Sequence, residues 1–289
     1  MTRFFIVLAM AGTAFAGSAL ASELMPGNGY SLHLGGHDGA LLQQGQAQSA
    51  GCAADHICIA DQAEAAVARR DQTFMVAKPD DPPSSERCPR ISVDVTAASS
   101  DERRLACLAA GDAIQLLARC GIEPRQALHV QILSEVRHPF GGVIFGFFDP
   151  KREKVFVTQE ANIPSLVKDT PYASLPQRDF YKSLIVHEVV HGIMHQNLKR
   201  PASTHAAYEY PAYALQIESL TPQVRNTFLQ SFDKRTVETV RLFSDPILFF
   251  DPYYFATRAY HHFKASANGC ADLTAMLEGE VTFIAPPRI

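Results

Sequence analysis

The sequence predicts an α+β fold, in which a small mixed or antiparallel sheet is followed by a helical half. Short segments with alternating apolar residues occur between residues 91 and 158, whereas helical patterns occupy most of the chain after residue 174. The chain has 289 residues, of which 47% are hydrophobic and 19% are charged, so it can bury a sizeable core. This composition excludes a disordered, collagenous or coiled-coil protein.

The expected elements begin with a strand at residues 91–95. Ser99 or Ser100 then caps a helix that carries Asp101 and Glu102 in its first turn and continues to about residue 119. The turn-type sequence at residues 149–153 predicts a hairpin between the strands on either side of it. The remaining expected elements are strands at residues 127–133, 142–148 and 154–158, and helices from Ser174 to about residue 196, at residues 206–220 and at residues 222–242.

The first 21 residues have the pattern of a secretory signal peptide. Arg3 precedes an apolar run at residues 4–16, and Ala19-Leu20-Ala21 forms an A-x-A cleavage site. The run is too short to span a bilayer comfortably, which disfavours the alternative of an uncleaved membrane anchor. We therefore expect a secreted or periplasmic mature protein without stable membrane insertion.

Two further segments follow the predicted cleavage site. Residues 22–87 are expected to be flexible and partly tied by a disulfide, because their first part is rich in Gly, Gln, Ala and Ser and their last part is rich in Pro. A short helix at residues 61–74 is the element expected within them. The main domain is expected at residues 88–289.

The six cysteines all follow the predicted cleavage site. An even number of cysteines in an exported chain favours up to three disulfides, with Cys52–Cys58 as the local pair. Cys107 and Cys120 are not expected to pair with each other, because one helix separates them along its axis. A cysteine metal site is disfavoured because the sequence contains no C-x-x-C. The other pairings stay open, and they involve Cys88 and Cys270 as well.

The charge of the chain disfavours a nucleic-acid partner. Lys and Arg together number 26 and Asp and Glu together number 30, which gives a formal net charge of −4. No excess of basic residues is present to neutralise a phosphate backbone. We therefore expect no nucleic-acid binding.

The most informative stretch is His187-Glu188-Val189-Val190-His191. On a helix, residues four apart lie one above the other on the same face, so both imidazoles can converge on one tetrahedral zinc ion. Glu188 lies beside them and could take a proton from a water that the metal activates. Ser174 and Gln177 form an apparent capping box at the start of this helix.

A catalytic zinc site needs a third protein ligand, and the best candidate is Glu209. It follows His191 by 18 residues, which is enough for one loop and a second helix that packs beside the first. Glu218 is the alternative ligand. His195 lies one further turn along the first helix, where it favours a supporting role over a ligand role. Asn197 stands where a metzincin would have its third His, which excludes that subclass.

These residues resemble the gluzincin group of zinc metallopeptidases, in which HExxH is followed at a comparable distance by a Glu ligand on the next helix. The chain is also similar to a family of uncharacterised secreted bacterial proteins with an E-x-x-A-Y-x-x-Q helix, which Glu209, Ala212, Tyr213 and Gln216 match. The likeness covers roughly residues 140–265. It implies a zincin-like active-site helix and one Zn²⁺ ion per chain, bound by His187, His191 and Glu209.

The resemblance also implies a donor to the oxyanion of the reaction and a strand for the substrate. Tyr260 and His262, with His261 next, are the candidate donors, because they lie in a late segment rich in Tyr and His. The strand at residues 154–158 is the candidate edge strand for an extended peptide.

The first reading is therefore an exported zinc-dependent peptidase that hydrolyses peptide bonds in a peptide or protein substrate. Its catalytic residues would be Glu188, which acts as the base, and Tyr260 or His262. The alternative is a non-catalytic, zinc-stabilised binding module of the cell envelope. A third reading is a metal-scavenging protein that uses the additional histidines. The sequence favours the first, because a carrier has no need of Glu188 next to its first ligand. The additional histidines are His33, His37, His195 and His205.

Overall fold

The computed structural model describes residues 84–138, 141–200, 202, 204–232, 243–265, 269–281 and 283. All of these belong to one compact unit of the chain. The expected signal peptide, the helix at residues 61–74 and the Cys52–Cys58 disulfide lie outside the described residues.

A five-stranded mixed sheet forms the first half of the described fold, as the sequence predicts. The strand order is β1-β2-β3-β7-β6. Strands β2, β3 and β7 are parallel, whereas β1 and β6 are antiparallel to their neighbours. The strands are β1 (Ser84–Arg87), β2 (Val93–Ala97), β3 (Leu128–Leu133), β6 (Gly146–Asp149) and β7 (Lys154–Thr158), and a separate two-stranded ladder joins β4 (Val136–Arg137) to β5 (Val143–Ile144).

The expected hairpin is confirmed, because β6 pairs with β7 in antiparallel register from Gly146 opposite Val157 to Asp149 opposite Lys154. The prediction that residues 154–158 form an edge strand is wrong. Strand β7 lies between β3 and β6, so β6 is the end strand of the described sheet on this side. Alternation along one strand cannot show which neighbour pairs with it, since that depends on contacts distant in sequence.

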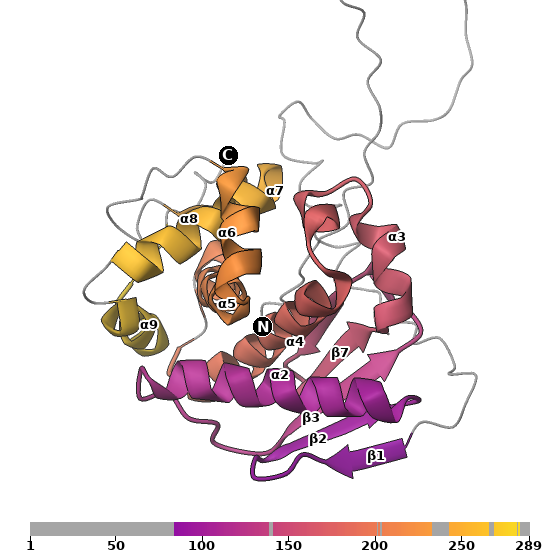
Figure 1. Ribbon diagram of the computed structural model, residues 1–289. Coiled ribbons are helices and arrows are strands. Elements are labelled where there is room, and N and C mark those ends of the chain that lie inside the picture. Colours follow the sequence, from indigo (N-terminus) through magenta and orange to yellow (C-terminus); the bar gives the residue numbers. More distant parts are fainter. Residues whose placement is uncertain are drawn as a thin grey trace, which may run out of the picture. The chain divides into compact units, whose positions relative to one another are not determined.

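The helices form the second half. Helices α2 and α4 pack on the sheet and on each other, α5 packs on α4, and α8 packs on α5, so that α4 lies between the sheet and α5 (Figure 1). The helix expected at residues 222–242 ends earlier, at Gln230. The helices are α2 (Ser100–Ala118), α3 (Ile163–Val167), α4 (Gln177–Asn197), α5 (His205–Ser219), α6 (Pro222–Gln230), α7 (Asp245–Phe250), α8 (Pro252–Ala265) and α9 (Gly269–Glu278), with 3₁₀ turns at Glu160–Asn162 and Pro171–Ser174.

The two predicted helix caps have different outcomes. Ser99 caps α2 as expected, because its hydroxyl oxygen accepts hydrogen bonds from the backbone N–H groups of Asp101 and Glu102 at 3.2 and 3.4 Å. The capping box at Ser174 is wrong. The Ser174 hydroxyl donates to the carbonyl oxygen of Pro171 within the preceding 3₁₀ turn, and α4 begins only at Gln177 without a side-chain cap.

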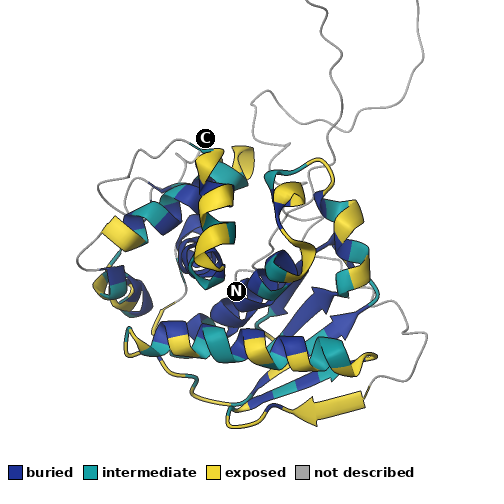
Figure 2. Ribbon diagram, in the orientation of Figure 1, coloured by how far each residue is buried: buried dark blue, intermediate teal, exposed yellow. Residues whose placement is uncertain are grey.

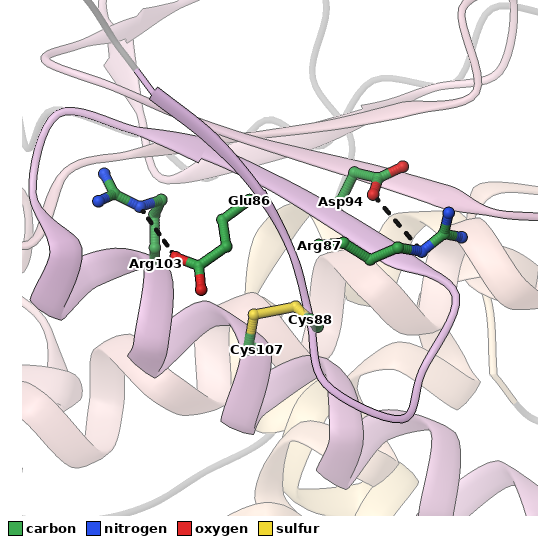
Figure 3. Close-up of a disulfide and its surroundings, with 6 residues drawn as sticks. All are labelled: Glu86, Arg87, Cys88, Asp94, Arg103 and Cys107. Carbon is green, nitrogen blue, oxygen red and sulfur yellow. Dashed lines mark ion pairs between the residues drawn. A yellow bond between two sulfur atoms is a disulfide. The ribbon is translucent and has the colours of Figure 1, made fainter.

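Two disulfides cross-link the described part of the chain. Cys88–Cys107 ties the segment between β1 and β2 to α2, and the ion pairs Glu86–Arg103 and Arg87–Asp94 lie on either side of it (Figure 3). Cys120–Cys270 ties the end of α2 to α9 across 150 residues of sequence. Cross-links that close long loops restrict the unfolded chain most, so the second should stabilise the fold strongly. Cys107 and Cys120 do not pair with each other, as expected.

Helix α4 is buried along the stretch that carries His187 and His191. Its residues from Ser183 to Met194 are all buried, and the dark blue of α4, α5 and the central strands in Figure 2 marks the core around it. Polar groups on such a helix must find partners inside the protein. None of the helices in the described ranges is long and apolar enough to cross a membrane.

Candidate metal centre

The three predicted ligands come together in the core. His187 and His191 lie one turn apart on α4, and Glu209 faces them from α5. The two Nε2 atoms are 3.1 Å apart, Glu209 Oε2 lies 3.4 Å from His187 Nε2, and Glu209 Oε1 lies 3.6 Å from His191 Nε2. Tetrahedral zinc with bonds of about 2.0–2.1 Å places its ligand atoms roughly 3.3–3.5 Å apart. The triangle therefore has the size that one ion requires.

Hydrogen bonds fix which nitrogen of His187 faces the centre. The Ser183 hydroxyl donates to the carbonyl oxygen of Phe180, so it can only accept from the Gln216 amide nitrogen, 3.5 Å away. The amide oxygen of Gln216 is then turned to His187 Nδ1, at 3.0 Å. An amide oxygen only accepts, so Nδ1 carries the hydrogen and Nε2 presents a lone pair to the cluster.

The charge states in the cluster suit a cation. Burial lowers the pKa of His191 to about 4, so its imidazole is neutral at neutral pH. Burial disfavours the ionised form of Glu209, but the neighbouring His191 and His187 outweigh it and hold the pKa of this carboxyl below its usual value. Neutral imidazole and ionised carboxylate are the forms that bind metal.

Glu188 lies beside the cluster and against the end strand of the sheet. A Cβ atom at Gly146 on β6 would lie 3.2 Å from Glu188 Oε1 and 2.6 Å from the carbonyl oxygen of Phe156, so only glycine leaves room for this contact. Burial raises the pKa of Glu188 well above its usual value, and the charge of Glu209 adds to the effect. A carboxylate in this environment takes up a proton readily.

Two tyrosine hydroxyls lie next to the same space. The ring of Tyr213, one turn after Glu209 on α5, is 4.7 Å from the ring of His187. The hydroxyls of Tyr213 and Tyr172 are buried and have no hydrogen-bond partner among the described residues. Burial raises the pKa of both phenols, so both keep their proton at neutral pH. An unpartnered buried hydroxyl calls for an explanation, and here it can donate to a group bound at the cluster.

A small pocket adjoins these groups. Its wall includes Gly146, His187, Glu188, Tyr172 and Tyr213, and its volume is about 10 Å³. That is roughly the volume a single water molecule needs. The pocket thus places one water-sized space beside His187, the Glu188 side chain and the two tyrosines.

The structure gives Tyr260 and His262 different partners. The ring of Tyr260 lies 5.6 Å from the Arg225 guanidinium, and His262 Nδ1 lies 2.6 Å from the Tyr210 hydroxyl. The ring of His261 lies edge-on to that of Tyr260. The described contacts do not bring the expected donors to the candidate metal cluster, whereas the ring of Tyr213 lies beside it. A segment rich in Tyr and His predicts such groups, but not the face of the neighbouring helix on which they pack.

The other candidate ligands also lie elsewhere. Glu218 pairs with Arg225 at 2.7 Å and with Lys264 at 2.9 Å. His195 Nδ1 lies 3.3 Å from the hydroxyl of Tyr208, and the ring of Tyr208 stacks on that of His191, so the supporting role of His195 stays a prediction. The ring of His205 faces Phe249, and His33 and His37 lie outside the described residues.

The fold and the cluster together define an α+β protein with a buried His-His-Glu group that could hold one metal ion. The chain belongs to a family described as "Family of unknown function (DUF6639)", whose model matches residues 93–286. The match includes α4, α5 and all three candidate ligands. No curated protein and no solved structure matches the chain.

Proposed function

We propose that this protein is an exported zinc-dependent peptidase of the gluzincin type. The observation that carries the proposal is the triangle of ligand atoms from His187, His191 and Glu209, with Glu188 next to it. Two histidines and one carboxylate are a ligand set of catalytic zinc, which keeps its fourth position open. A bound zinc ion would supply Lewis acidity and lower the pKa of water.

The chain's own residues would carry the proton transfers. Glu188 would accept a proton from the attacking water and pass it to the leaving amine, a role that its raised pKa supports. Tyr213 would donate a hydrogen bond to the carbonyl oxygen as negative charge develops on it. Strand β6 would pair with the extended substrate, because it ends the described sheet and Gly146 on it touches Glu188.

The disulfides are compatible with an exported chain. Cys88–Cys107 and Cys120–Cys270 fit an oxidising compartment, where disulfides persist. The predicted signal peptide gives the same location, which we propose to be secreted or periplasmic.

Metal analysis and a peptide-library digest test the proposal together. The purified mature protein should contain about one zinc per chain and cleave peptides. Glu188→Gln keeps a side chain of the same shape without its basicity, so it should retain zinc while hydrolysis falls by roughly 10²–10⁴-fold. A protein without stoichiometric metal, or a Glu188→Gln variant with full activity, would refute the assignment.

A second candidate is a non-catalytic, zinc-stabilised binding module of the cell envelope. The observation that favours it is the burial of the centre, since His187, Glu188, His191 and Glu209 are only 2%, 1%, 4% and 6% exposed. This function predicts stoichiometric zinc without cleavage. It also predicts the same peptide affinity before and after Glu188→Gln.

A further inference from the structure

A second pocket lies between the end of α4, the start of α5 and the end of α9. Its volume is about 120 Å³, and none of the three candidate metal ligands belongs to its lining. The buried members of the lining are Met194, Ala207, Tyr208, Pro211 and Met276. The pocket is therefore a separate space from the metal centre, with a mainly apolar interior.

The volume of the pocket sets the size of its occupant. Pockets for drug-sized ligands have volumes of about 300–1,000 Å³, whereas an apolar cavity of about 150 Å³ holds one benzene. A pocket of about 120 Å³ thus has room for one aromatic ring or one short branched chain. Met194 and Met276 line it with flexible side chains that adapt to either shape.

One positive charge without a partner adjoins this apolar space. Arg200 is the one charged residue in the described lining, and its side chain forms no ion pair or hydrogen bond with the described residues. The nearby carboxylate of Glu278 is paired with Lys199 at 2.6 Å. The Arg200 guanidinium is therefore available to an anionic group of a ligand.

The end of α9 supports the stem of Arg200. A Cβ atom at Gly279 would lie 3.4–3.8 Å from the aliphatic carbons of the Arg200 side chain. Gly279 has a φ of +74°, which glycine adopts without strain. Arg200 is exposed, whereas Met276 is buried, so the charge lies at the rim of the pocket and the apolar surface lies inside.

We propose that this pocket is a binding site for a small apolar carboxylate, such as a short branched or aromatic acid. The apolar group would fill the space between Met194 and Met276. The planar guanidinium of Arg200 would hold the carboxylate through paired charge-assisted hydrogen bonds. The site does not depend on the proposed peptidase activity, because the lining contains neither a metal ligand nor Glu188.

Three probes separate the two parts of this recognition. Isocaproate carries a branched apolar chain and a carboxylate, isocaproamide has the same chain without the charge, and acetate has the charge without the chain. In the zinc-loaded protein with ¹³C-labelled methionine methyl groups, isocaproate should shift the signals of Met194 and Met276 saturably. Isocaproamide should bind at least about 10-fold more weakly, and acetate should not shift these signals. The Met276→Leu variant assigns the signals.

Two variants test the two ends of the pocket. Arg200→Met keeps an aliphatic stem and removes the charge, so isocaproate should bind at least about 10-fold more weakly while isocaproamide binds as before. Arg119→Met, which changes an exposed arginine outside the lining, is the matched control and should bind isocaproate as wild type does. Ala207→Leu fills the space and should abolish the shifts from both probes. Thermal unfolding checks that each variant is folded.

Several results would overturn the inference. One is equal affinity for isocaproate and isocaproamide, which would show that Arg200 does not recognise the carboxylate. Another is unchanged affinity for isocaproate in Arg200→Met, which is the result expected if the acid binds the zinc ion instead. A Met276 signal that no probe shifts would also overturn it, including the case in which the chain itself fills the pocket. The presence or absence of peptide cleavage alters none of these readouts, so the two proposals can fail separately.

Discussion

Helix α5 contacts two buried histidine groups, and they differ in how their polar atoms are satisfied. On the α8 side, His262 Nδ1 lies 2.6 Å from the Tyr210 hydroxyl and 4.0 Å from Asp272 Oδ2, so this histidine has a hydroxyl and a carboxylate as partners. On the α4 side, two imidazole nitrogens and a carboxylate point at one another. The first group is explained by its own hydrogen bonds.

The second group lacks a donor for each acceptor if both Nε2 atoms carry lone pairs, and a bound cation would account for it. His187 Nε2 presents a lone pair, and the Glu209 carboxylate faces it at 3.4 Å. Electron pairs that face each other in the core repel, because little water is present to screen them. A cation at the centre turns each of these contacts into an attraction. The comparison shows that buried polar residues indicate a binding site when their lone pairs converge, and a structural role when donors and acceptors match.

The largest expected effect follows from removing one histidine from each group. His191→Ala deletes a ligand, so the protein should lose stoichiometric zinc and all peptide hydrolysis. His262→Leu should keep about one zinc per chain and lose only stability, by about 1–3 kcal/mol, because the buried Tyr210 hydroxyl loses its partner. Elemental analysis and urea unfolding measure the two properties. Equal zinc content in both variants would show that the two histidine groups do not differ in metal binding.

The sequence predicted those parts of the site that depend on local spacing. The turn between His187 and His191 places both on one helix face, and a single loop returns the chain so that Glu209 reaches them. The strand order was not predictable in this way, because β7 pairs with β3 across more than twenty residues of sequence.

The position of the expected donors was not predictable for a related reason. The segment containing Tyr260 and His262 is rich in suitable groups, but on α8 it is Phe255 that faces Tyr213, whereas His262 contacts Tyr210. Tyr213 follows Glu209 by four residues and Gln216 follows it by seven, so both lie on the Glu209 face of α5. With Glu209 as a ligand, this spacing on a helix predicts that Tyr213 and Gln216 lie near the cluster.

The next effect concerns the tyrosines of the two groups. Tyr213→Phe removes a hydroxyl that borders the metal-binding cluster, so kcat should fall by roughly 10²–10³-fold while zinc content and KM stay near wild type. Tyr210→Phe removes the hydroxyl beside His262 and should change stability instead of kcat. Steady-state kinetics on one cleaved peptide distinguish them. If Tyr210→Phe lowers kcat as much as Tyr213→Phe does, the proposed role of Tyr213 as the hydrogen-bond donor to the carbonyl oxygen is refuted.

The smallest expected effect is on zinc affinity, and it concerns the hydrogen bonds that orient His187. Gln216→Leu leaves the Nδ1–H of His187 without its acceptor, so the Nε2 lone pair is no longer held toward the cluster, and zinc affinity should fall by about 10- to 100-fold. Ser183→Ala removes only the weaker 3.5 Å contact to the Gln216 amide and should change the affinity less. Competition with a zinc chelator measures both affinities, and ¹⁵N NMR of the His187 ring reports its tautomer. A Gln216→Leu variant with wild-type affinity and an unchanged tautomer would show that packing alone orients His187, which would make the acceptor at Nδ1 dispensable for the site.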